Sequence, residues 1–336
     1  MAYIKRLPPT GSVNPGPFVT QWSSDMTAVA NCFPMEFFRH NGNTCVVMAR
    51  AEGSGYGGYF RKRTGAATWA NFGCHDICYH TGSYPCIYEM SATKFLLVGN
   101  NATYTGNGRV QAFDTEVFYN NENLNGTSVY YPAFVFNGTN LFVEAYAPPW
   151  SPGNNYTLKR ANLSDPIQSW ATVDRPAAAG CACMVPFNGV WNSRLGYYTS
   201  SGGILVYTAV ANGPIISRPG AIYRNRLYWA DYTNQRVLLK NGKDGPWAQA
   251  FATTGYNAWC VASGGGVLLV GAARIADFKA VILRYVDKTA SFVEEYVATS
   301  GTYVNKMQYV EAEGCFYASV STGAIFRGIV KEGKRE

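Results

Sequence analysis

The sequence predicts an all-β protein, and three observations carry this prediction. Charged residues make up only 15% of the 336 residues, while aromatic residues make up another 15% and glycines number 35. Few charges disfavour long solvated helices, whereas Tyr, Val, Thr, Phe and Gly suit pleated strands joined by tight turns. Hydrophobic residues, at 47%, suffice for a sizeable core. The third observation is an internal repeat.

The repeat is marked by a recurrent Trp-Ala pair. It occurs at Trp69, Trp170 and Trp247, in the segments TWANFG, SWATVD and PWAQAF. Before each tryptophan the chain presents two apolar strands, a loop, a third strand and a turn. We therefore expect each tryptophan to start the outer strand of a sheet and to pack between neighbouring sheets, where a large ring buries much apolar area.

Seven units of roughly 48 residues fit this order. First strands are expected at 30–41, 86–90, 132–138, 180–189, 221–225, 257–265 and 306–314. Second strands are expected at 44–53, 94–102, 140–148, 196–203, 226–234, 267–275 and 315–323. Third strands are expected at 57–65, 108–116, 155–165, 204–213, 235–245, 279–290 and 324–333. Other units lack the tryptophan: the fourth ends in 214–218, and the sixth has Phe292 in its place.

The last unit is one strand short, and the segment at 1–10 is a spare strand. Pairing the two would close a ring and leave no free edge. Four short strands per unit at this spacing is the pattern of a β-propeller. We predict one domain over residues 1–336, with seven blades preferred. Merging the fourth and fifth units would leave six.

Turns between second and third strands are the first candidate site. In a four-stranded meander they share one face with the blade-to-blade connections. They carry the aromatic residues Tyr56, Tyr104, Trp150 and Tyr232. Rings at solvated turn tips can stack on sugars or anchor a protein partner. The alternative is that each ring folds back over its own hairpin.

The segment CHDICYHTGSYPC is a weak candidate for a metal site, through Cys74, Cys78, His80 and Cys86. Thiolates and an imidazole could bind zinc. The spacing matches no standard zinc motif, and small thiols packed near the axis are the preferred interpretation. We therefore expect no metal and no cofactor. Nine cysteines are an odd number, which disfavours a complete disulfide framework.

The net charge of +7 is mild for this length. Its local clusters are Arg61-Lys62-Arg63 and the segment 331–335, which we expect to be solvated strand or turn. Nucleic-acid binding requires a denser basic stripe and is not expected. No apolar run approaches ~20 residues, so no membrane span is expected. The first residues lack an apolar signal-peptide core, so no secretory signal is expected.

The segments RKRTGAATWANF and KNGKDGPWAQAF resemble the Asp-box repeat of sialidases and related propellers. The first copy has Arg63 or Thr64 where the aspartate belongs, while the other keeps Asp244 and Gly245. The resemblance implies a propeller fold. It also implies an alternative function, a sialidase-like glycoside hydrolase, for which Arg6 in KRLP is the only matching site residue.

The composition as a whole resembles that of bacteriophage virion proteins: low charge and short strands rich in Asn, Gly and Tyr. This resemblance implies a tail, fibre or capsid-surface component in several copies, made in the host cytoplasm and located in the virion. Its partners would be other virion proteins and a host-surface glycan. We therefore prefer a non-enzymatic structural and binding module. A cytosolic protein-interaction propeller is a further alternative.

Overall fold

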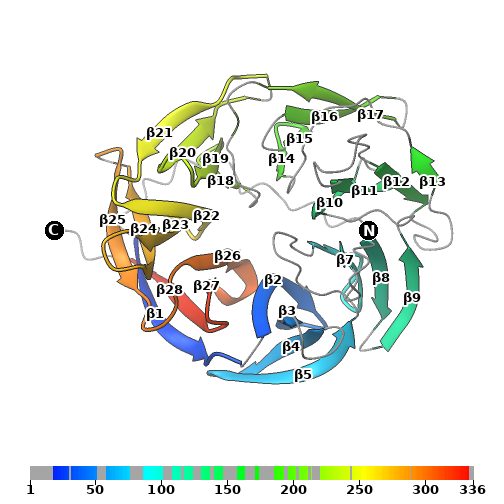
Figure 1. Cartoon of the computed structure of the whole chain (residues 1–336), viewed down its shortest axis with the longest axis horizontal. Helices are drawn as coiled ribbons and strands as arrows, with labels where there is room; N and C mark the ends of the chain where they lie inside the picture. Colours follow the sequence, from blue (N-terminus) through cyan, green and yellow to red (C-terminus); the bar gives the residue numbers. More distant parts are fainter. Residues whose placement is uncertain are drawn as a thin grey trace.

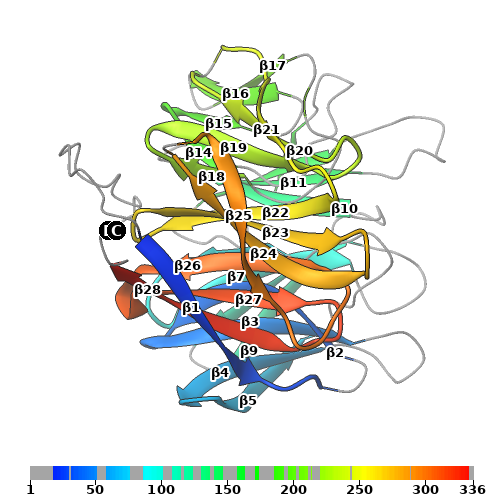
Figure 2. The same ribbon diagram turned by 90° about the vertical axis from the view of Figure 1, so that its left-hand side faces the viewer.

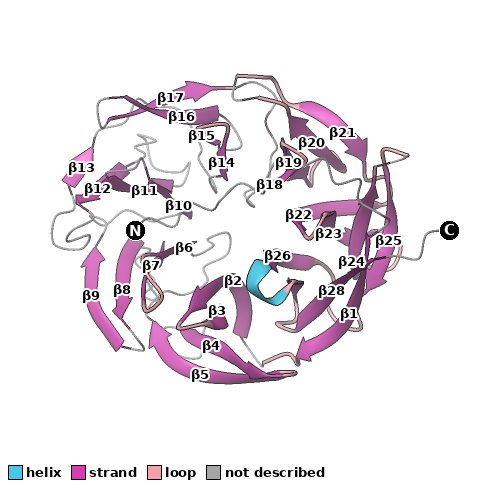
Figure 3. Cartoon of the chain, turned by 180° about the vertical axis from the view of Figure 1, so that it is seen from behind, coloured by secondary structure: helices cyan, strands magenta, loops and turns pink. Residues whose placement is uncertain are grey.

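The computed structural model describes seventeen stretches of the chain. They are residues 18–29, 32–50, 58–75, 86–100, 108–114, 117–123, 130–136, 140–146, 157–162, 171–173, 185–192, 196–201, 204–210, 213, 220–242, 244–287 and 289–332. These residues form seven four-stranded antiparallel sheets. The sheets lie side by side around a common centre (Figure 1). One short 3-10 helix, η1 (Glu311–Glu313), interrupts the strands (Figure 3).

Three sheets follow one another in the first half of the chain. The first contains β2 (Cys32–His40), β3 (Asn43–Arg50), β4 (Gly58–Gly65) and β5 (Thr68–His75). The second contains β6 (Cys86–Glu89), β7 (Lys94–Asn100), β8 (Gly108–Asp114) and β9 (Val117–Asn123). The third contains β10 (Tyr130–Phe136), β11 (Asn140–Tyr146), β12 (Thr157–Asn162) and β13 (Ala171–Val173). The first strand of each sheet faces the centre and the fourth lies at the rim (Figure 1).

Three further sheets repeat this order. The fourth contains β14 (Val185–Phe187), β15 (Val190–Asn192), β16 (Gly196–Ser201) and β17 (Ile204–Ala209). The fifth contains β18 (Ala221–Tyr223), β19 (Arg226–Asp231), β20 (Arg236–Lys240) and β21 (Ala248–Ala252). The sixth contains β22 (Tyr256–Gly264), β23 (Val267–Arg274), β24 (Lys279–Val286) and β25 (Ser291–Val297).

The seventh sheet, called the terminal sheet below, joins the two ends of the described chain. It contains β26 (Val304–Val310), β27 (Cys315–Val320), β28 (Ile325–Glu332) and β1 (Phe18–Met26). β1 pairs antiparallel with β28, with Phe18 opposite Glu332 and Met26 opposite Ile325. It crosses the outside of the molecule between β25 and β28 (Figure 2). The place beside β28 that we expected residues 1–10 to fill is therefore taken by Phe18–Met26, and residues 1–10 lie outside the described residues.

The fourth sheet differs from the prediction by one strand. Residues 180–189 were expected to form a single first strand, but Asn188 and Gly189 form a turn between β14 and β15. Both have positive φ angles, 52° and 74°. An Asn-Gly pair suits such a two-residue hairpin. The expected second and third strands at 196–203 and 204–213 are consequently the third and fourth, and the expected fourth, 214–218, lies outside the described residues.

The core consists of apolar clusters between neighbouring sheets. One of them joins the sixth sheet to the terminal sheet through Leu269, Val304 and Phe316, all of them fully buried. A middle strand is buried on both sides, as every side chain of β23 up to Ala273 shows. We call the interface between two neighbouring sheets a seam. Because alternate side chains of a strand point to opposite faces, each sheet presents one row of side chains to the seam on either side of it. Among the described residues, such clusters join the first sheet to the second and to the terminal sheet, the fourth to the fifth, the fifth to the sixth, and the sixth to the terminal sheet.

We predict that Gly328→Ala destabilises the terminal sheet. Gly328 lies opposite Trp22 in the β1–β28 register, and a Cβ there would stand 2.6 Å from the Trp22 ring. Displacing a packed ring typically costs ~1–3 kcal/mol. Thermal unfolding measures the loss. Gly242→Ala is the matched control, because its Cβ meets nothing within 4 Å, and equal stability of the two variants would contradict the prediction.

Candidate functional site

One end of the ring carries the turns between second and third strands together with the links between sheets. Three backbone hydrogen bonds join them. Thr253 N donates to Gln235 O at 2.7 Å, Ile275 N to Gly255 O at 2.9 Å and Ser321 N to Tyr303 O at 3.0 Å. The turns 232–235, 275–278 and 321–324 therefore lie beside the links 253–255 and 298–303. We call this surface the connection face.

Three aromatic rings form a row on the connection face. The Trp259 ring centroid lies 4.6 Å from that of Tyr232 and 4.5 Å from that of Tyr303. The Trp259 and Tyr303 rings are stacked, with 21° between their planes. All three side chains are half-buried. The row spans the fifth, sixth and terminal sheets, so three consecutive sheets contribute to one surface.

Local backbone features position these rings. Trp259 is the extra residue of a β-bulge in β22, where the register shifts between Ala258 and Cys260. Bulges re-aim a side chain that regular pleating would point elsewhere. Tyr232 follows Asp231, a buried carboxylate that accepts hydrogen bonds from Arg236 Nε and Asn234 Nδ2, each at 2.8 Å. Asp231 thus fixes the turn on which Tyr232 sits.

Phe278 lies on the same face, in the turn between β23 and β24. Its side chain is 71% exposed, more than any other large hydrophobic side chain among the described residues. Its φ angle is +54°, in the left-handed region that bulky residues rarely adopt. Its amide donates to Arg274 O at 2.9 Å. Ile275, at the other end of this turn, is also exposed, at 37%. The turn therefore presents two apolar side chains to solvent.

An ionic network braces this turn. Arg274 donates to both Asp277 oxygens, at 2.9 and 2.7 Å, and to Glu294 on β25 at 2.9 Å. Hydrogen bonds from Arg274 hold the pKa of Asp277 down at about 2. Burial, and then its hydrogen bond to Glu294, raise the pKa of Tyr256 above its ordinary value. Since the Asp277 and Arg274 charges persist at neutral pH, this network ties the turn to β25.

The aromatic residues predicted for this face are only partly within the described residues. Tyr232 lies in the row, whereas Tyr56, Tyr104 and Trp150 lie outside the described residues. Sequence reasoning missed Trp259, Tyr303 and Phe278. Phe278 was detectable, because RIADFK is the equivalent turn of the sixth unit. Trp259 was not, since the bulge that re-aims it leaves no signal in the strand pattern.

The structure places two of the three repeat tryptophans at the seams between sheets. Trp69 is the second residue of β5, and its ring lies 6.0 Å from Tyr317 of the terminal sheet. Trp247 directly precedes β21, is 6% exposed, and packs in a cluster with Val185 and Phe187 of the fourth sheet. Trp170 lies outside the described residues.

The cysteine-rich segment is mostly outside the described residues, which include neither Cys78 nor His80. Cys74 belongs to β5, without a described side chain, and Cys86 is half-buried in β6. In the part of the chain that the structure describes, no three His, Cys, Asp or Glu side chains gather as metal ligands would. The same part contains no helix of the length and hydrophobicity needed to span a membrane.

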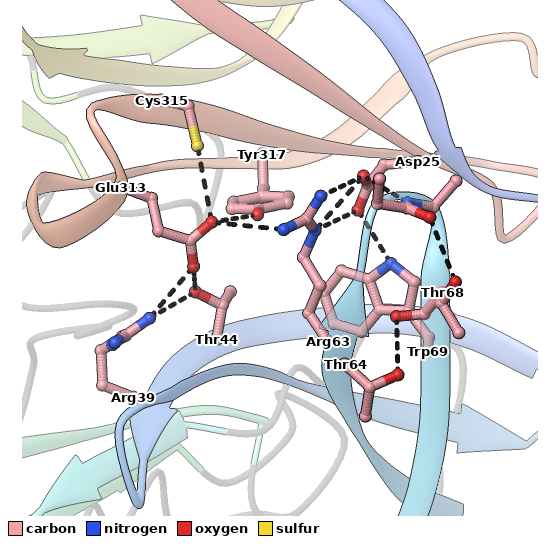
Figure 4. A network of polar contacts seen from close by, with 12 residues as sticks. Asp25, Arg39, Thr44, Arg63, Thr64, Thr68, Trp69, Glu313, Cys315 and Tyr317 are labelled. Atoms are coloured by element: carbon pink, nitrogen blue, oxygen red, sulfur yellow. Dashed lines mark hydrogen bonds and ion pairs between the residues drawn. The ribbon is translucent and has the colours of Figure 1, made fainter.

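A second polar cluster lies at the seam between the first and terminal sheets (Figure 4). Asp25 of β1 is buried, and its two oxygens accept from Arg63 Nε at 3.0 Å and Nη2 at 3.0 Å. Trp69 Nε1 also donates to Asp25, at 2.9 Å, and the Ala67 amide donates at 3.3 Å. Arg63, which we expected in a solvated cluster, has an exposed side-chain fraction of only 17%. The expectation for Arg63 is thus wrong, because a neighbouring sheet supplies a carboxylate.

Glu313 is the second carboxylate of this cluster. It accepts hydrogen bonds from Tyr317 at 2.6 Å and from Thr44, and it pairs with Arg39 at 3.1 Å and with Arg63 at 3.8 Å. Burial alone would raise the pKa of Glu313. The hydrogen bonds and the two guanidinium groups outweigh burial, and its pKa is lowered from 4.5. Arg39 and Arg63 are thus engaged within the protein, at a seam rather than around a shared pocket.

We predict that Asp25→Ala lowers the free energy of unfolding by about 3 kcal/mol. The substitution leaves the Arg63 guanidinium and the Trp69 N–H without their acceptor in a largely buried place, which is costly. Chemical denaturation measures the change. Lys94→Ala is the control, because it removes an ion pair with Asp114 that is 48% and 41% exposed, worth less than ~1 kcal/mol. Equal losses in both variants would contradict a special role for Asp25.

Acid should weaken the same seam through Glu313. Because its folded pKa lies below 4.5, the stability it contributes is present above that value and is lost as pH falls through the folded pKa. Glu313→Gln removes this contribution at every pH. We expect the difference in unfolding free energy between wild type and Glu313→Gln to shrink between pH 5 and pH 3. A difference that stays constant over this range would rule out the linkage.

Comparison with known proteins gives a likeness of fold. No protein-family model matches the chain, and no curated protein matches its sequence. A solved structure of YCF48 from Cyanidioschyzon merolae is similar, with a TM-score of 0.58 and 10% identity over 92% of this chain and 98% of that chain. Chaetomium thermophilum Raptor gives a TM-score of 0.56 and 12% identity over 95% of this chain and 29% of that chain.

A third likeness is looser. It is to a Penicillium chrysogenum α-L-arabinanase complexed with arabinobiose, with a TM-score of 0.47 and 12% identity over 76% of this chain and 93% of that chain. At that TM-score the arabinanase carries no argument about this chain. The two stronger likenesses, together with the four-stranded antiparallel sheets, show that this chain has an all-β fold of the β-propeller type.

Proposed function

We propose that the chain is a non-enzymatic, seven-bladed binding propeller that contacts a partner protein through its connection face. The seven four-stranded sheets support the blade count. The β1–β28 pairing supports a ring completed by an N-terminal strand, residues 18–26 rather than 1–10. On this proposal residues 18–332 form one domain.

The observation that carries the proposal is Phe278. A phenylalanine with a left-handed backbone costs roughly 1–2 kcal/mol, and its 71% exposed ring recovers little of this by burial. The Arg274 network ties the turn to β25, which supports the backbone that displays the ring. A rigid exposed aromatic side chain loses little entropy on binding. These properties suit an anchor residue for a protein partner.

The aromatic row supplies a second anchor on the same face. Trp259 is flanked by Tyr232 and Tyr303, so the three rings hold one another in place. Tryptophan and tyrosine are enriched among residues that dominate binding energy, and tyrosine adds a hydroxyl for hydrogen bonding. Together with Phe278 and Ile275, the row combines apolar and polar contacts, as stable protein interfaces do.

We further propose a bacteriophage virion as the setting, on the composition of the sequence. The partner would then be another virion protein, and the particle would contain several copies of this chain. A host-surface glycan is a proposed additional ligand. Mass spectrometry of purified particles tests the setting. Recovery of the chain in stoichiometric amounts supports it, and recovery only in the soluble fraction of the producing cell favours the cytosolic interaction propeller.

The proposal predicts opposite effects of Phe278→Asn on folding and on binding. Asparagine tolerates the left-handed region, so the free energy of unfolding should rise by about 1 kcal/mol. Partner proteins that co-purify with the wild-type chain from producing cells should be lost or reduced at least tenfold. Quantitative mass spectrometry of the co-purified proteins measures binding, and thermal unfolding measures stability.

Ile329→Asn is the matched control for this experiment. Ile329 is another exposed apolar side chain, at 38%, but it lies within β28 and outside the connection face. It should retain the co-purified proteins. If both variants retain them, or both lose them, the connection face is not the binding surface. Lower stability of Phe278→Asn would show that the ring supports its own fold instead.

A further inference from the structure

A cavity of about 290 Å³ lies where β1 ends against the β4–β5 turn. It belongs to the outer seam between the first and terminal sheets, away from the connection face. Its walls come from two elements distant in sequence, residues 24–27 on one side and Arg61 with residues 67–69 on the other. Figure 4 shows Asp25 hydrogen-bonded to both Arg63 and the Trp69 ring, and of these three residues Asp25 and Trp69 line the cavity.

The cavity carries an excess positive charge. Asp25 is engaged with Arg63, Trp69 Nε1 and the Ala67 amide, so its charge is balanced within the protein. Arg61 differs from Arg63, because no ion pair involves it among the described residues. Its Nε donates to Asn71 at 2.8 Å, and its Nη1 lies 3.5 Å from Met26 Sδ, a weak acceptor. A half-buried guanidinium with donors to spare therefore lines the wall.

The remaining walls combine hydroxyl groups with an aromatic ring. Ser24, Thr27 and Thr68 are exposed residues with hydroxyls at the cavity, and Thr68 Oγ1 donates to Ala66 O at 3.1 Å. The Trp69 side chain is half-buried and held by Asp25. A ligand here would meet a fixed cation, several small hydroxyls and a large ring. Polar groups that converge beside an aromatic wall can fix the orientation of a small ligand.

We propose that this cavity binds an acidic sugar unit, a hexuronate, with its carboxylate on Arg61 and its ring against Trp69. A guanidinium binds a carboxylate through two parallel hydrogen bonds, which a neutral sugar cannot offer. Hydroxyls of the sugar exchange hydrogen bonds with Ser24, Thr27 and Thr68. The volume is at the lower end of the range for small-molecule sites, which suits one ring rather than a longer chain. The site is independent of the connection face.

Titration calorimetry of the whole chain with glucuronate, glucose and acetate tests this proposal. Glucuronate is expected to bind at least tenfold more tightly than either glucose or acetate. Arg61→Gln should weaken glucuronate binding by about tenfold or more, since a hydrogen-bonded charged partner contributes ~1.5–3 kcal/mol. Arg61→Lys should also weaken it, because an ammonium lacks the two-pronged geometry. Thermal unfolding checks that both variants remain folded.

Lys62→Gln is the matched control, since it removes the same charge from the next residue of β4, which does not line the cavity. It should bind glucuronate as the wild type does. If Lys62→Gln and Arg61→Gln lost the same affinity for glucuronate, the effect would come from net charge alone, and the proposed site would be wrong. Equal binding of acetate and glucuronate, or of glucose and glucuronate, would overturn the assignment to a sugar acid, and so would the absence of any heat with glucuronate.

Discussion

The arrangement of the whole molecule depends on β1. This strand pairs along its length with β28. At its start Thr20 donates to Glu295 of the sixth sheet, and at its end Asp25 accepts from Arg63 of the first sheet. One segment therefore fixes the terminal sheet to both of its neighbours. This pairing also covers the edge of β28, so that the terminal sheet has four strands like its neighbours.

Other carboxylates between neighbouring sheets serve the same purpose as Asp25. Asp287 accepts from Tyr223 at 2.6 Å across the fifth and sixth sheets, and Glu36 pairs with Lys306 at 2.7 Å across the first and terminal sheets. Apolar packing between sheets is non-directional, so it does not by itself set how two sheets are rotated relative to each other. Hydrogen bonds to a half-buried carboxylate are directional. The sequence has only 21 acidic residues, and several of them are used in this way.

Strand order could be predicted from the sequence because the apolar segments alternate with turn residues at a regular spacing. The prediction was wrong in the fourth sheet, because the Asn188-Gly189 turn was not recognised as a hairpin. The seam could not be predicted, because Asp25 is far in sequence from Arg63 and Trp69. The turn before Trp69 contains no aspartate of its own, and Asp25 of the neighbouring sheet accepts a hydrogen bond from the Ala67 amide of that turn. Of the candidate site, turn aromatics were predictable by position, as Tyr232 shows, whereas the bulge at Trp259 was not.

The register of β1 on β28 has a consequence for biosynthesis. Phe18 is translated 314 residues before Glu332, the residue opposite it in the register. Until β28 has been synthesised, β1 has no strand to pair with, and a contact with residues nearby in the sequence cannot replace this pairing. This pairing must therefore wait until β28 has been translated, and its rate should be limited by the encounter of two segments distant in sequence. A nascent chain stalled before residue 325 would lack β28, so β1 would remain unpaired and prone to aggregate. Such a product would be expected to bind chaperones.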